Sequence, residues 1–223
     1  MKNRLGVVIT GGECPPKRIT RQAMHGKNAL IVAADSGLFH AEEAELKPDY
    51  IIGDMDSIEI KRLTAYPVEF VIRHSQDKDY TDTELAFKLV VDKGCDEIWI
   101  IGGGGGRIDH LFGIRSLFER EIFPSRWITN NADIWCIEAS DKTSTETFWA
   151  ENTLSLKTEK DSVVSVFPLG GGPWEAESEG LKWPLKDLPW NRGFFGLSNV
   201  AVDGEFIIKA EKGRFLVILP LLI

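Results

Sequence analysis

Short apolar runs alternate with helical patterns over the first 130 residues of the chain. Six of these runs are rich in valine and isoleucine and mostly apolar on both faces, which is typical of buried parallel strands. The runs are Leu5–Ile9, Ala29–Ala34, Tyr50–Ile52, Val68–Ile72, Ile98–Ile101 and Trp127–Thr129. Because helical patterns lie between them, we expect a βαβ architecture with a mainly parallel sheet.

One helix in this part has clear start and stop signals. Thr81 and Glu84 have the spacing of a capping box, with Thr81 as the N-cap, and Gly94 is placed to end the helix. The apolar stripe between them consists of Leu85, Ala86, Leu89 and Val90. The pattern also predicts a helix from about Asp109 to about Glu121 and a shorter one at Ala41–Leu46, stopped by Pro48.

From about Ile134 the helical periodicity disappears and short alternating runs follow. These runs are Thr153–Lys157, Val163–Phe167, Trp174–Glu179, Glu205–Lys209 and Arg214–Leu219. Turn signals separate them, and Asp203-Gly204 between two such runs predicts a hairpin. We therefore expect an α/β domain with a mainly parallel, Rossmann-like sheet at residues 1–133 and an all-β, sandwich-like domain at residues 134–223. The polar stretch Ser140–Glu146 is predicted to be a loop near the junction.

Composition narrows the class of protein. The net charge of −8 argues against a general nucleic-acid binder, although bound Mg²⁺ makes an acidic site compatible with a nucleotide. No apolar stretch reaches the roughly 18 residues of a membrane span, and Met1–Gly12 is interpreted as a first strand rather than a secretory signal. Cys14, Cys95 and Cys136 match no metal or redox pattern, so reduced thiols and a cytoplasmic location are expected.

Five polar or glycine-rich segments each follow a predicted strand directly. They are Gly11-Gly12, Asp35-Ser36-Gly37, Gly53–Ser57, Asp77–Asp82 and Gly102–His110. In open parallel sheets, ligands bind outside the carboxyl ends of the strands. We therefore expect the five segments to converge on one rim of the sheet and to form the active site there.

Asp54 and Asp56 are the most informative pair in these segments. Residues two apart in an extended segment point the same way, so two carboxylates beside Gly53 would suit a hard cation such as Mg²⁺. The alternative is an ordinary turn, since glycine, aspartate and serine are turn formers.

Asp77, Asp79 and Asp82 stand at the start of the capped helix. Favourable interaction with the helix dipole could account for Asp82, but three acids in six residues exceed what capping needs. We predict metal or nucleotide binding for at least one of them. Lys78 is either a phosphate contact or an ordinary exposed lysine.

The glycine run Gly102–Gly106 frees backbone N–H groups to face phosphate oxygens, although it lacks the Lys-Ser/Thr of a P-loop. Arg107 offers a bidentate fork for phosphate. Asp109 and His110 can supply a ligand or a proton acceptor, and His110 equally fits a structural hydrogen-bonding role.

Taken in order, these motifs resemble those of the thiamine pyrophosphokinase family. The resemblance rests on Asp35-Ser36-Gly37, Pro48–Ser57, Asp79–Asp82, Gly105–His110, Glu179–Leu185 and Gly196–Asn199. They are similar to that family's Asp-Gly-Gly, Pro-Asp…Gly-Asp-x-Asp-Ser, Asp-x-Thr-Asp and Gly-Gly-Arg-x-Asp-His segments and, for the last two, to its thiamine-binding region. The resemblance spans roughly residues 30 to 218. Ser36 departs from the usual glycine, and residues 140–151 match none of the family's motifs.

The resemblance implies an enzyme that transfers pyrophosphate from ATP to thiamine, giving thiamine pyrophosphate and AMP. It implies Mg²⁺ as cofactor, nucleotide and metal on the α/β domain, a thiamine pocket on the β-domain, and a homodimer with shared active sites. The implied catalytic residues are Asp54, Asp56, Asp79, Asp82 and Asp109. The implied metal ligands are Asp54, Asp56 and Asp79, with Asp82 as an alternative third ligand.

The resemblance also implies residues that bind the two substrates. Those for the nucleotide are Asp35, Ser36, Gly37, Gly105, Arg107 and His110. Those for thiamine are Trp183, Ser198 and Asn199. Either Asp79 or Asp109 could accept the hydroxyl proton. Trp183 would stack on the cationic ring system, unless it is a core residue, and Ser198-Asn199 is also a common turn pair.

Two other functions fit part of the pattern. A metal-dependent phosphohydrolase, or a kinase of a related small alcohol, would use the same aspartates. A non-catalytic nucleotide-binding module would keep the glycines but would not require so many carboxylates. The β-rich domain, with Trp183 in it, favours the pyrophosphokinase over the hydrolase, and the number of carboxylates favours it over the binding module.

Overall fold

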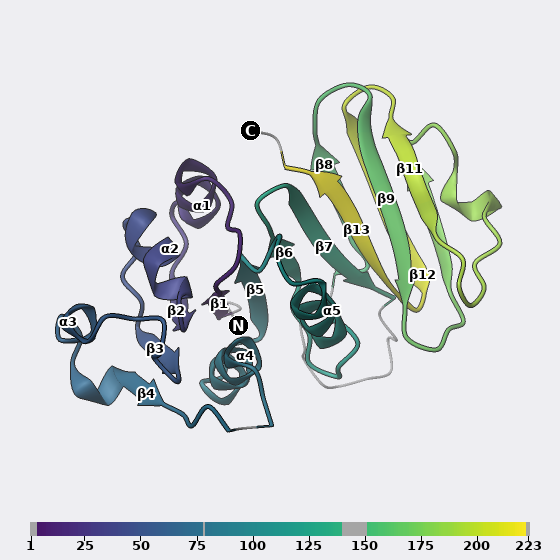
Figure 1. The fold of residues 1–223 in the computed structure, drawn as a ribbon. Helices are drawn as coiled ribbons and strands as arrows, with labels where there is room; N and C mark the ends of the chain where they lie inside the picture. Colours follow the sequence, from purple (N-terminus) through teal and green to yellow (C-terminus); the bar gives the residue numbers. More distant parts are fainter. Residues whose placement is uncertain (1–3, 78, 140–150, 222–223) are drawn as a thin grey trace. The chain divides into compact units, whose positions relative to one another are not determined.

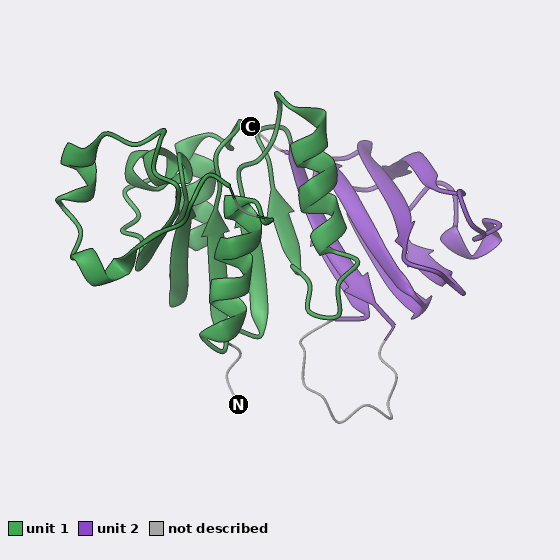
Figure 2. Ribbon diagram, turned by 60° about the horizontal axis from the view of Figure 1, so that its bottom comes forward, with its two compact units in different colours: residues 1–131, 223 green, residues 132–222 purple. Residues whose placement is uncertain are grey.

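The computed structural model describes residues 4–77, 79–139 and 151–221. They divide into two compact units, with the division between Asn131 and Ala132, two residues before the predicted domain boundary (Figure 2). Lys78 and the whole of the predicted loop at Ser140–Glu146 lie outside the described residues. Among the helices of the described part, none has the length and apolar character needed to span a bilayer.

The first unit contains a six-stranded sheet in the order β6-β5-β1-β2-β3-β4 (Figure 1). The strands are β1 (Leu5–Ile9), β2 (Ala29–Ala34), β3 (Tyr50–Gly53), β4 (Val71–Arg73), β5 (Glu97–Ile101) and β6 (Arg126–Ile128). Every pairing among them is parallel, which confirms the predicted sheet. The apolar run predicted as the fourth strand is split, because Val68–Phe70 forms a 3-10 turn before β4 begins.

Helices cover both faces of this sheet, with α1 and α2 on one face and α4 and α5 on the other (Figure 1). They are α1 (Lys17–Met24), α2 (Gly37–Glu43), α3 (Ile60–Leu63), α4 (Asp82–Asp92) and α5 (Ile108–Leu117). The capping box is confirmed, because the Thr81 hydroxyl accepts from the Glu84 N–H and the Glu84 carboxylate accepts from the Thr81 N–H. Gly94 follows α4 with φ +77°. Helix α1 was not predicted, because its sequence has no apolar stripe: only Thr20 and Met24 are buried.

Helix α2 differs from its predicted position at Ala41–Leu46. It begins at Gly37, directly after the turn that follows β2, and ends at Glu43. The left-handed backbone of Glu45, with φ +57°, ends the helix before Pro48 is reached. The early start places the amino end of α2 at the carboxyl edge of the sheet.

The strand order reverses direction at β1, and this reversal positions the site. From β1 the chain moves to β2 and β3 on one side, and returns through β5 and β6 on the other. Connections that leave the carboxyl ends of β1 and β5 therefore diverge to opposite faces of the sheet. Crevices that bind ligands form at such points in open α/β sheets.

The second unit is a sandwich of two antiparallel sheets. One has the order β11-β9-β13-β7 and the other β10-β12-β8. The strands are β7 (Ala132–Glu138), β8 (Thr153–Lys157), β9 (Ser162–Leu169), β10 (Glu175–Glu179), β11 (Gly196–Ala201), β12 (Glu205–Lys212) and β13 (Arg214–Pro220). Apolar side chains of both sheets form one core, including Val166 and Val217 from the first and Phe206 and Ile208 from the second. This confirms the predicted β-rich second part.

The hairpin predicted at Asp203-Gly204 is wrong. The turn exists, with Gly204 at φ +76°, but it connects strands of different sheets. Strand β11 pairs with β9, whereas β12 pairs with β10 and β8. A turn signal between two strands marks the reversal of the chain, and whether the strands pair depends on the core that each must cover.

Candidate functional site

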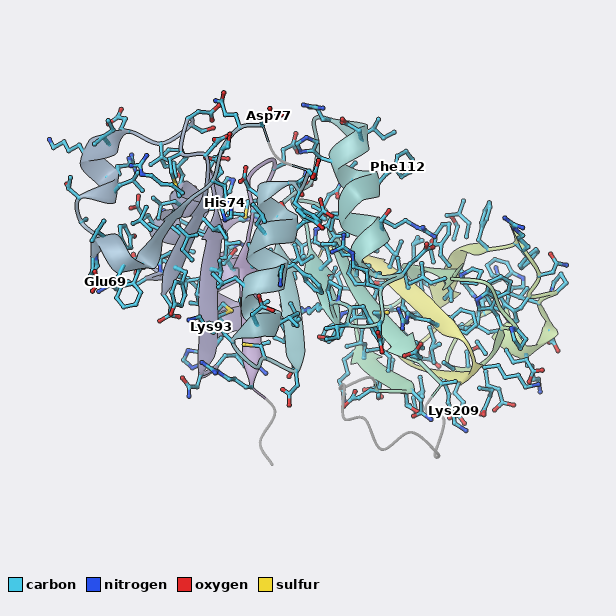
Figure 3. The ribbon with its side chains drawn as sticks, turned by 90° about the horizontal axis from the view of Figure 1, so that it is seen from below. Glu69, His74, Asp77, Lys93, Phe112 and Lys209 are labelled. Atoms are coloured by element: carbon cyan, nitrogen blue, oxygen red, sulfur yellow. The ribbon has the colours of Figure 1, made fainter. Side chains whose placement is uncertain are left out.

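A cavity of about 820 Å³ opens at the carboxyl edge of the parallel sheet, and all five segments that follow strands contribute to it. The lining includes Gly11, Asp35, Asp54, Asp82 and Arg107, one or more from each segment. The structure thus brings together residues that lie up to 107 positions apart in the chain, from Thr10 to Leu117. Figure 3 shows Asp77 and Lys93 at opposite ends of this unit, with Asp77 at the edge where the segments gather.

Three carboxylates form an acidic cluster at one end of this edge. Oxygen atoms of Asp35, Asp54 and Asp56 lie within 4.8 Å of one another. Asp79, which the resemblance implied as a third ligand, is not one of these three residues, whereas Asp35, expected to bind nucleotide, is one of them. The reason is the sheet order, because β2 and β3 are neighbours and the segments after them meet directly.

Two residues in the segments that carry the acidic cluster have a strained backbone conformation. Asp35 and Met55 both have left-handed backbones, with φ +45° and +64°. The Asp35 N–H donates to the Ile52 carbonyl at 2.9 Å, which ties the end of β2 to β3. The Asp56 N–H donates to Asp54 Oδ1 at 3.1 Å, so the two carboxylates are held side by side.

The chemistry of the acidic cluster fits a hard cation. Asp35 Oδ1 is buried and has no hydrogen-bond partner among the described residues. A buried carboxylate oxygen without a partner is costly unless a cation or proton satisfies it. Three carboxylates at this spacing match the oxygen ligands that Mg²⁺ prefers. The cluster is therefore the candidate metal centre.

Asp82, the first residue of α4, lies beside the acidic cluster. A Cβ atom built on Gly53 would come within 3.2 Å of both Asp82 Oδ1 and Asp35 Cβ, so glycine at position 53 permits this close approach. The Thr10 and Thr83 hydroxyls share a hydrogen bond of 2.6 Å that ties the end of β1 to α4. The predicted site residue Asp82 is thus anchored at the cavity wall.

Glu84 also lines the cavity and is fixed from both sides. Its carboxylate accepts from the Thr81 N–H at 3.0 Å and from Arg120 at 2.5 Å. Partial burial raises the pKa of Glu84, but the Thr81 backbone and Arg120 hydrogen bonds lower it more, so the net pKa lies below its usual range. Glu84 is therefore a negatively charged wall residue at neutral pH.

The glycine run uses much of its backbone for the fold. The N–H groups of Gly102, Gly103 and Gly104 donate to the carbonyls of Ile128, Gly11 and Glu13 at 2.8–2.9 Å. Left-handed backbones at Gly105 and Gly106, with φ +63° and +60°, follow. The N–H groups of these two glycines are used in no hydrogen bond among the described residues. Of the five glycine N–H groups predicted to face phosphate, those of Gly105 and Gly106 are therefore the ones left to do so.

Arg107 and Asp109 form a two-point ion pair at the cavity. Arg107 donates to the two Asp109 oxygens at 3.1 and 2.5 Å. The hydrogen bond from Arg107 holds the pKa of the Asp109 carboxyl below its usual range, and the same bond raises the pKa of Arg107. His110 also lines the cavity. Asp109 therefore has its proton-accepting oxygens engaged by a guanidinium.

The second unit holds the residues expected to bind the other substrate. Trp183 is 49% exposed, so it is not a core residue of the sandwich. Asn199 is only 4% exposed, and its amide bonds to the backbone of Trp183 in both directions, accepting at 3.1 Å and donating at 2.6 Å. Ser198 is exposed, with a left-handed backbone of φ +59° and its N–H on Ser165 Oγ at 3.1 Å. Trp183 and Ser198 are accessible to a ligand, whereas the amide of Asn199 is occupied.

Several cavity residues were not identified from the sequence. They are Thr10, Glu13, Gln76 and Glu84. Gln76 donates to Asp56 Oδ2 at 3.0 Å and so supports the acidic cluster. Thr10 and Glu13 flank the Gly11-Gly12 pair, and that proximity was the only signal available for them. Gln76 had no signal of its own.

Comparison with known proteins gives a consistent result over both units. The family model described as "Thiamin pyrophosphokinase, catalytic domain" matches residues 22–125, and "Thiamin pyrophosphokinase, vitamin B1 binding domain" matches residues 151–215. The thiamine pyrophosphokinase of Bacillus subtilis is 29% identical over 194 residues, which are 85% of this chain and 83% of the relative. Thiamine pyrophosphokinase 1 of Oryza sativa is 27% identical over 175 residues, and this chain spans 64% of its length.

Solved structures support the fold. The crystal structure of the Bacillus subtilis thiamine pyrophosphokinase superposes with a TM-score of 0.75 at 21% identity, covering 99% of this chain and 100% of that one. The Candida albicans thiamin pyrophosphokinase gives 0.66 at 17% identity, covering 98% and 90%.

Proposed function

The chain belongs to the thiamine pyrophosphokinase family and is an enzyme of that family, and from this premise we propose how its residues divide the work. In the reaction, the hydroxyl oxygen of thiamine forms a bond to the β-phosphorus of ATP. The bond between that phosphorus and the oxygen bridging to the α-phosphorus breaks, and AMP leaves. The hydroxyl proton passes to a base. Such a transfer depends mainly on positioning and on neutralising charge.

Asp35, Asp54 and Asp56 are the proposed magnesium ligands. Their oxygens lie within 4.8 Å of one another, and the buried Asp35 Oδ1 has no partner among the described residues. Mg²⁺ bound there would offset the negative charge of the triphosphate. Gln76 and Ser57 hold the Asp56 carboxylate, with hydrogen bonds of 3.0 and 2.9 Å, and so keep its oxygens directed.

Arg107 and the N–H groups of Gly105 and Gly106 are the proposed phosphate contacts. Arg107 already binds a carboxylate, Asp109, with the two-point geometry that a phosphate also accepts. A phosphate group would therefore compete with Asp109 for the same guanidinium. This exchange would place the negative charge of ATP between Arg107 and the acidic cluster.

Asp82 is the proposed proton acceptor. It lines the cavity and lies beside Gly53 and the acidic cluster. As long as Arg107 binds it, Asp109 is a poorer base, because the guanidinium lowers the pKa of the carboxyl. Asp79 does not line the cavity. A base must lie within hydrogen-bond reach of the proton it takes, which favours Asp82 of the three.

Trp183 and Ser198 are the proposed thiamine contacts. An indole face attracts a cation by about 0.5–2 kcal/mol, and the Lys182 ammonium already lies 4.6 Å from the ring centroid of Trp183. The thiazolium of thiamine would take an equivalent position. The exposed Ser198 side chain can hydrogen-bond the aminopyrimidine. Asn199 would act through Trp183, whose backbone it holds.

We also propose a homodimer with shared sites, in a reducing compartment such as the cytoplasm. Exposed apolar side chains on and beside the edge strand β11 support an association surface: Leu197 is 62% exposed and Phe195 47%. The three cysteines are free thiols, which supports the reducing compartment.

The single observation that carries the assignment is the joint match of a catalytic and a vitamin B1 binding domain in one chain. The test is incubation with ATP, Mg²⁺ and thiamine, followed by separation of nucleotides and thiamine esters. We expect AMP and thiamine pyrophosphate in equal amounts. Phosphate release without thiamine would indicate a phosphohydrolase instead, ADP with a monophosphate ester would indicate a simple kinase, and no turnover would indicate a binding module.

A further inference from the structure

Glu13, in the connection from β1 to α1, is joined to two other strand ends. Its backbone N–H and carbonyl both bond to Gly104, at 2.7 and 2.9 Å, as an isolated β-bridge. Its side-chain Oε2 accepts a hydrogen bond from Asn130 Nδ2. Gly104 follows β5 and Asn130 follows β6, so Glu13 is directed away from β2 and β3 and from the acidic cluster between them.

The glycine run is shaped around this side chain. A Cβ atom at Gly105 would lie 2.2 Å from Glu13 Cδ, and one at Gly104 would lie 2.3 Å from Asn130 Oδ1. Contacts shorter than about 3 Å are excluded by van der Waals repulsion. Two of the five glycines therefore admit the Glu13 and Asn130 side chains, a role separate from any contact with phosphate. Glu13 lines the cavity, and its Oε1 has no hydrogen-bond donor among the described residues.

The charges in the cavity determine which part of ATP can contact Glu13. A carboxylate repels phosphate groups, so the triphosphate is placed between the acidic cluster, where a cation can neutralise it, and the Arg107 guanidinium, rather than against Glu13. What remains of ATP is the nucleoside, which is uncharged and carries hydroxyl donors. A carboxylate that still has a free oxygen is an acceptor for such donors, and acidic residues after strands of α/β sheets bind ribose hydroxyls in this way.

We propose that Glu13, held by Asn130, hydrogen-bonds the ribose hydroxyls of ATP and so selects ribonucleotides over deoxyribonucleotides. This inference rests on the proposed placement of the triphosphate between the acidic cluster and Arg107. It identifies a specificity residue at the end of the site opposite to the metal. It also explains why glycines are needed at positions 104 and 105 although the Gly104 N–H is already used by the fold.

The experiment compares ATP with 2′-deoxyATP and 3′-deoxyATP on the wild-type chain and on Glu13→Ala and Glu13→Gln. Two quantities are measured: kcat/KM for thiamine-dependent AMP formation, and affinity from calorimetric titration of each nucleotide with Mg²⁺. Glu69→Ala is the matched control, because Glu69 is an exposed glutamate of the same unit and lies far from Asp77 in Figure 3. Melting temperatures of all variants are measured alongside.

The wild-type chain should prefer ATP to at least one deoxynucleotide by roughly 10- to 100-fold, the range for a hydrogen bond to a charged group. Glu13→Ala should lower the affinity for ATP by that factor, leave that deoxynucleotide unchanged, and so abolish the preference. Glu13→Gln, which keeps one acceptor, should retain part of it, and Glu69→Ala all of it.

Equal use of ATP and both deoxynucleotides by the wild-type chain would overturn the inference, as would a preference that survives Glu13→Ala at full strength. If Glu13→Ala raised the KM for thiamine and left the nucleotide preference unchanged, Glu13 would be a thiamine contact, which would also overturn the inference. Failure of the proposed function gives a different result, namely absence of thiamine-dependent AMP, while the nucleotide affinities still report on Glu13. Failure of the metal placement would appear as nucleotide affinities that do not respond to Mg²⁺.

Discussion

Asn199 holds the backbone of Trp183 with both atoms of its amide: Oδ1 accepts from the Trp183 N–H at 3.1 Å, and Nδ2 donates to the Trp183 carbonyl at 2.6 Å. The same Oδ1 also accepts from the Val200 N–H at 2.8 Å. Trp183 is thus a half-exposed indole on a fixed backbone. A stacking surface of this kind needs no ordering when a ligand binds, which favours affinity.

Asn199→Ala should therefore weaken thiamine binding through Trp183. The variant leaves two backbone groups of Trp183 without partners, and we expect the free energy of unfolding to fall by about 1–3 kcal/mol. The KM for thiamine should rise several-fold while the KM for ATP stays unchanged. Steady-state kinetics with each substrate varied in turn, together with chemical denaturation, measures both effects.

Two variants serve as controls for Asn199. Asn199→Asp keeps the acceptor and loses the donor, so it should fall between the wild type and alanine. Asn191→Ala removes an exposed asparagine of the same unit and should change neither quantity. If Asn199→Ala raised the KM for thiamine without any loss of stability, direct contact with the substrate would replace the positioning role.

The acidic cluster gives a prediction about metal dependence. Asp35→Ala, Asp54→Ala and Asp56→Ala should each lower kcat/KM on the order of 10²-fold or more, because each removes a carboxylate from the proposed magnesium site. Asp79→Ala should have a much smaller effect, since Asp79 is not in the cluster. Circular dichroism should show an intact fold in all four variants. Near-normal activity of Asp35→Ala at low Mg²⁺ would contradict this ligand set.

The acidic cluster also shows which kind of site information a sequence carries. Asp54 and Asp56 were found because their spacing is local, and the capping box of Thr81 and Glu84 for the same reason. Asp35 was expected to bind nucleotide, because its meeting with Asp54 depends on β2 lying beside β3. The contact between Glu13 and Asn130, which are 117 residues apart, had no local signal, because it depends on how β1 and β6 are placed in the sheet.

The strands follow the same rule. Five of the six strands of the first unit were predicted from their apolar runs to within one residue at each end, and the exception is the fourth run, which begins with the 3-10 turn at Val68–Phe70. Strands β7 and β11 were missed, because Ala132–Glu138 and Gly196–Ala201 mix polar and apolar residues without a clear period. Their pairing partners in the folded sheet, rather than local propensity, make them strands. The same dependence on partners made the predicted hairpin at Asp203-Gly204 wrong.

Asp109 gives a prediction about pH dependence. Since Arg107 holds the pKa of Asp109 below its usual range, the carboxyl is already deprotonated near neutral pH. Asp109→Asn should therefore leave the shape of the activity profile between pH 5 and 9 unchanged. Rates of AMP formation across that range measure it. Loss of the acidic limb of the profile in this variant would identify Asp109 as the titrating base.

Glu84 gives a prediction about stability. Its pKa in the folded chain lies below the value of about 4.3 expected for the unfolded chain, so its contribution is present above that pH and is lost as the pH falls through the folded-state pKa. Glu84→Gln should lower the free energy of unfolding by about 1 kcal/mol at pH 7. The difference from the wild type should shrink below about pH 4. Asp92→Asn, on the same helix but in an exposed pair with Lys88, should show a smaller difference.

Leu197 allows a test of the proposed dimer. It lies on β11, an edge strand of its sheet, and is 62% exposed, with Phe195 beside it stacked on Phe167 at 5.3 Å. An unpaired edge with apolar side chains favours association with a second chain. Leu197→Glu would place a charge there, and we expect the molar mass from light scattering to fall from two chains to one at micromolar concentration.

The comparison variant is Ile207→Glu, which places the same charge on the outer face of the other sheet, where Ile207 is 39% exposed. It should remain a dimer. If two subunits share each active site, Leu197→Glu should also lose activity, and activity should return as the protein concentration is raised. A monomeric Leu197→Glu variant with full activity would contradict shared sites, and a wild-type chain that is monomeric at all concentrations would contradict the dimer.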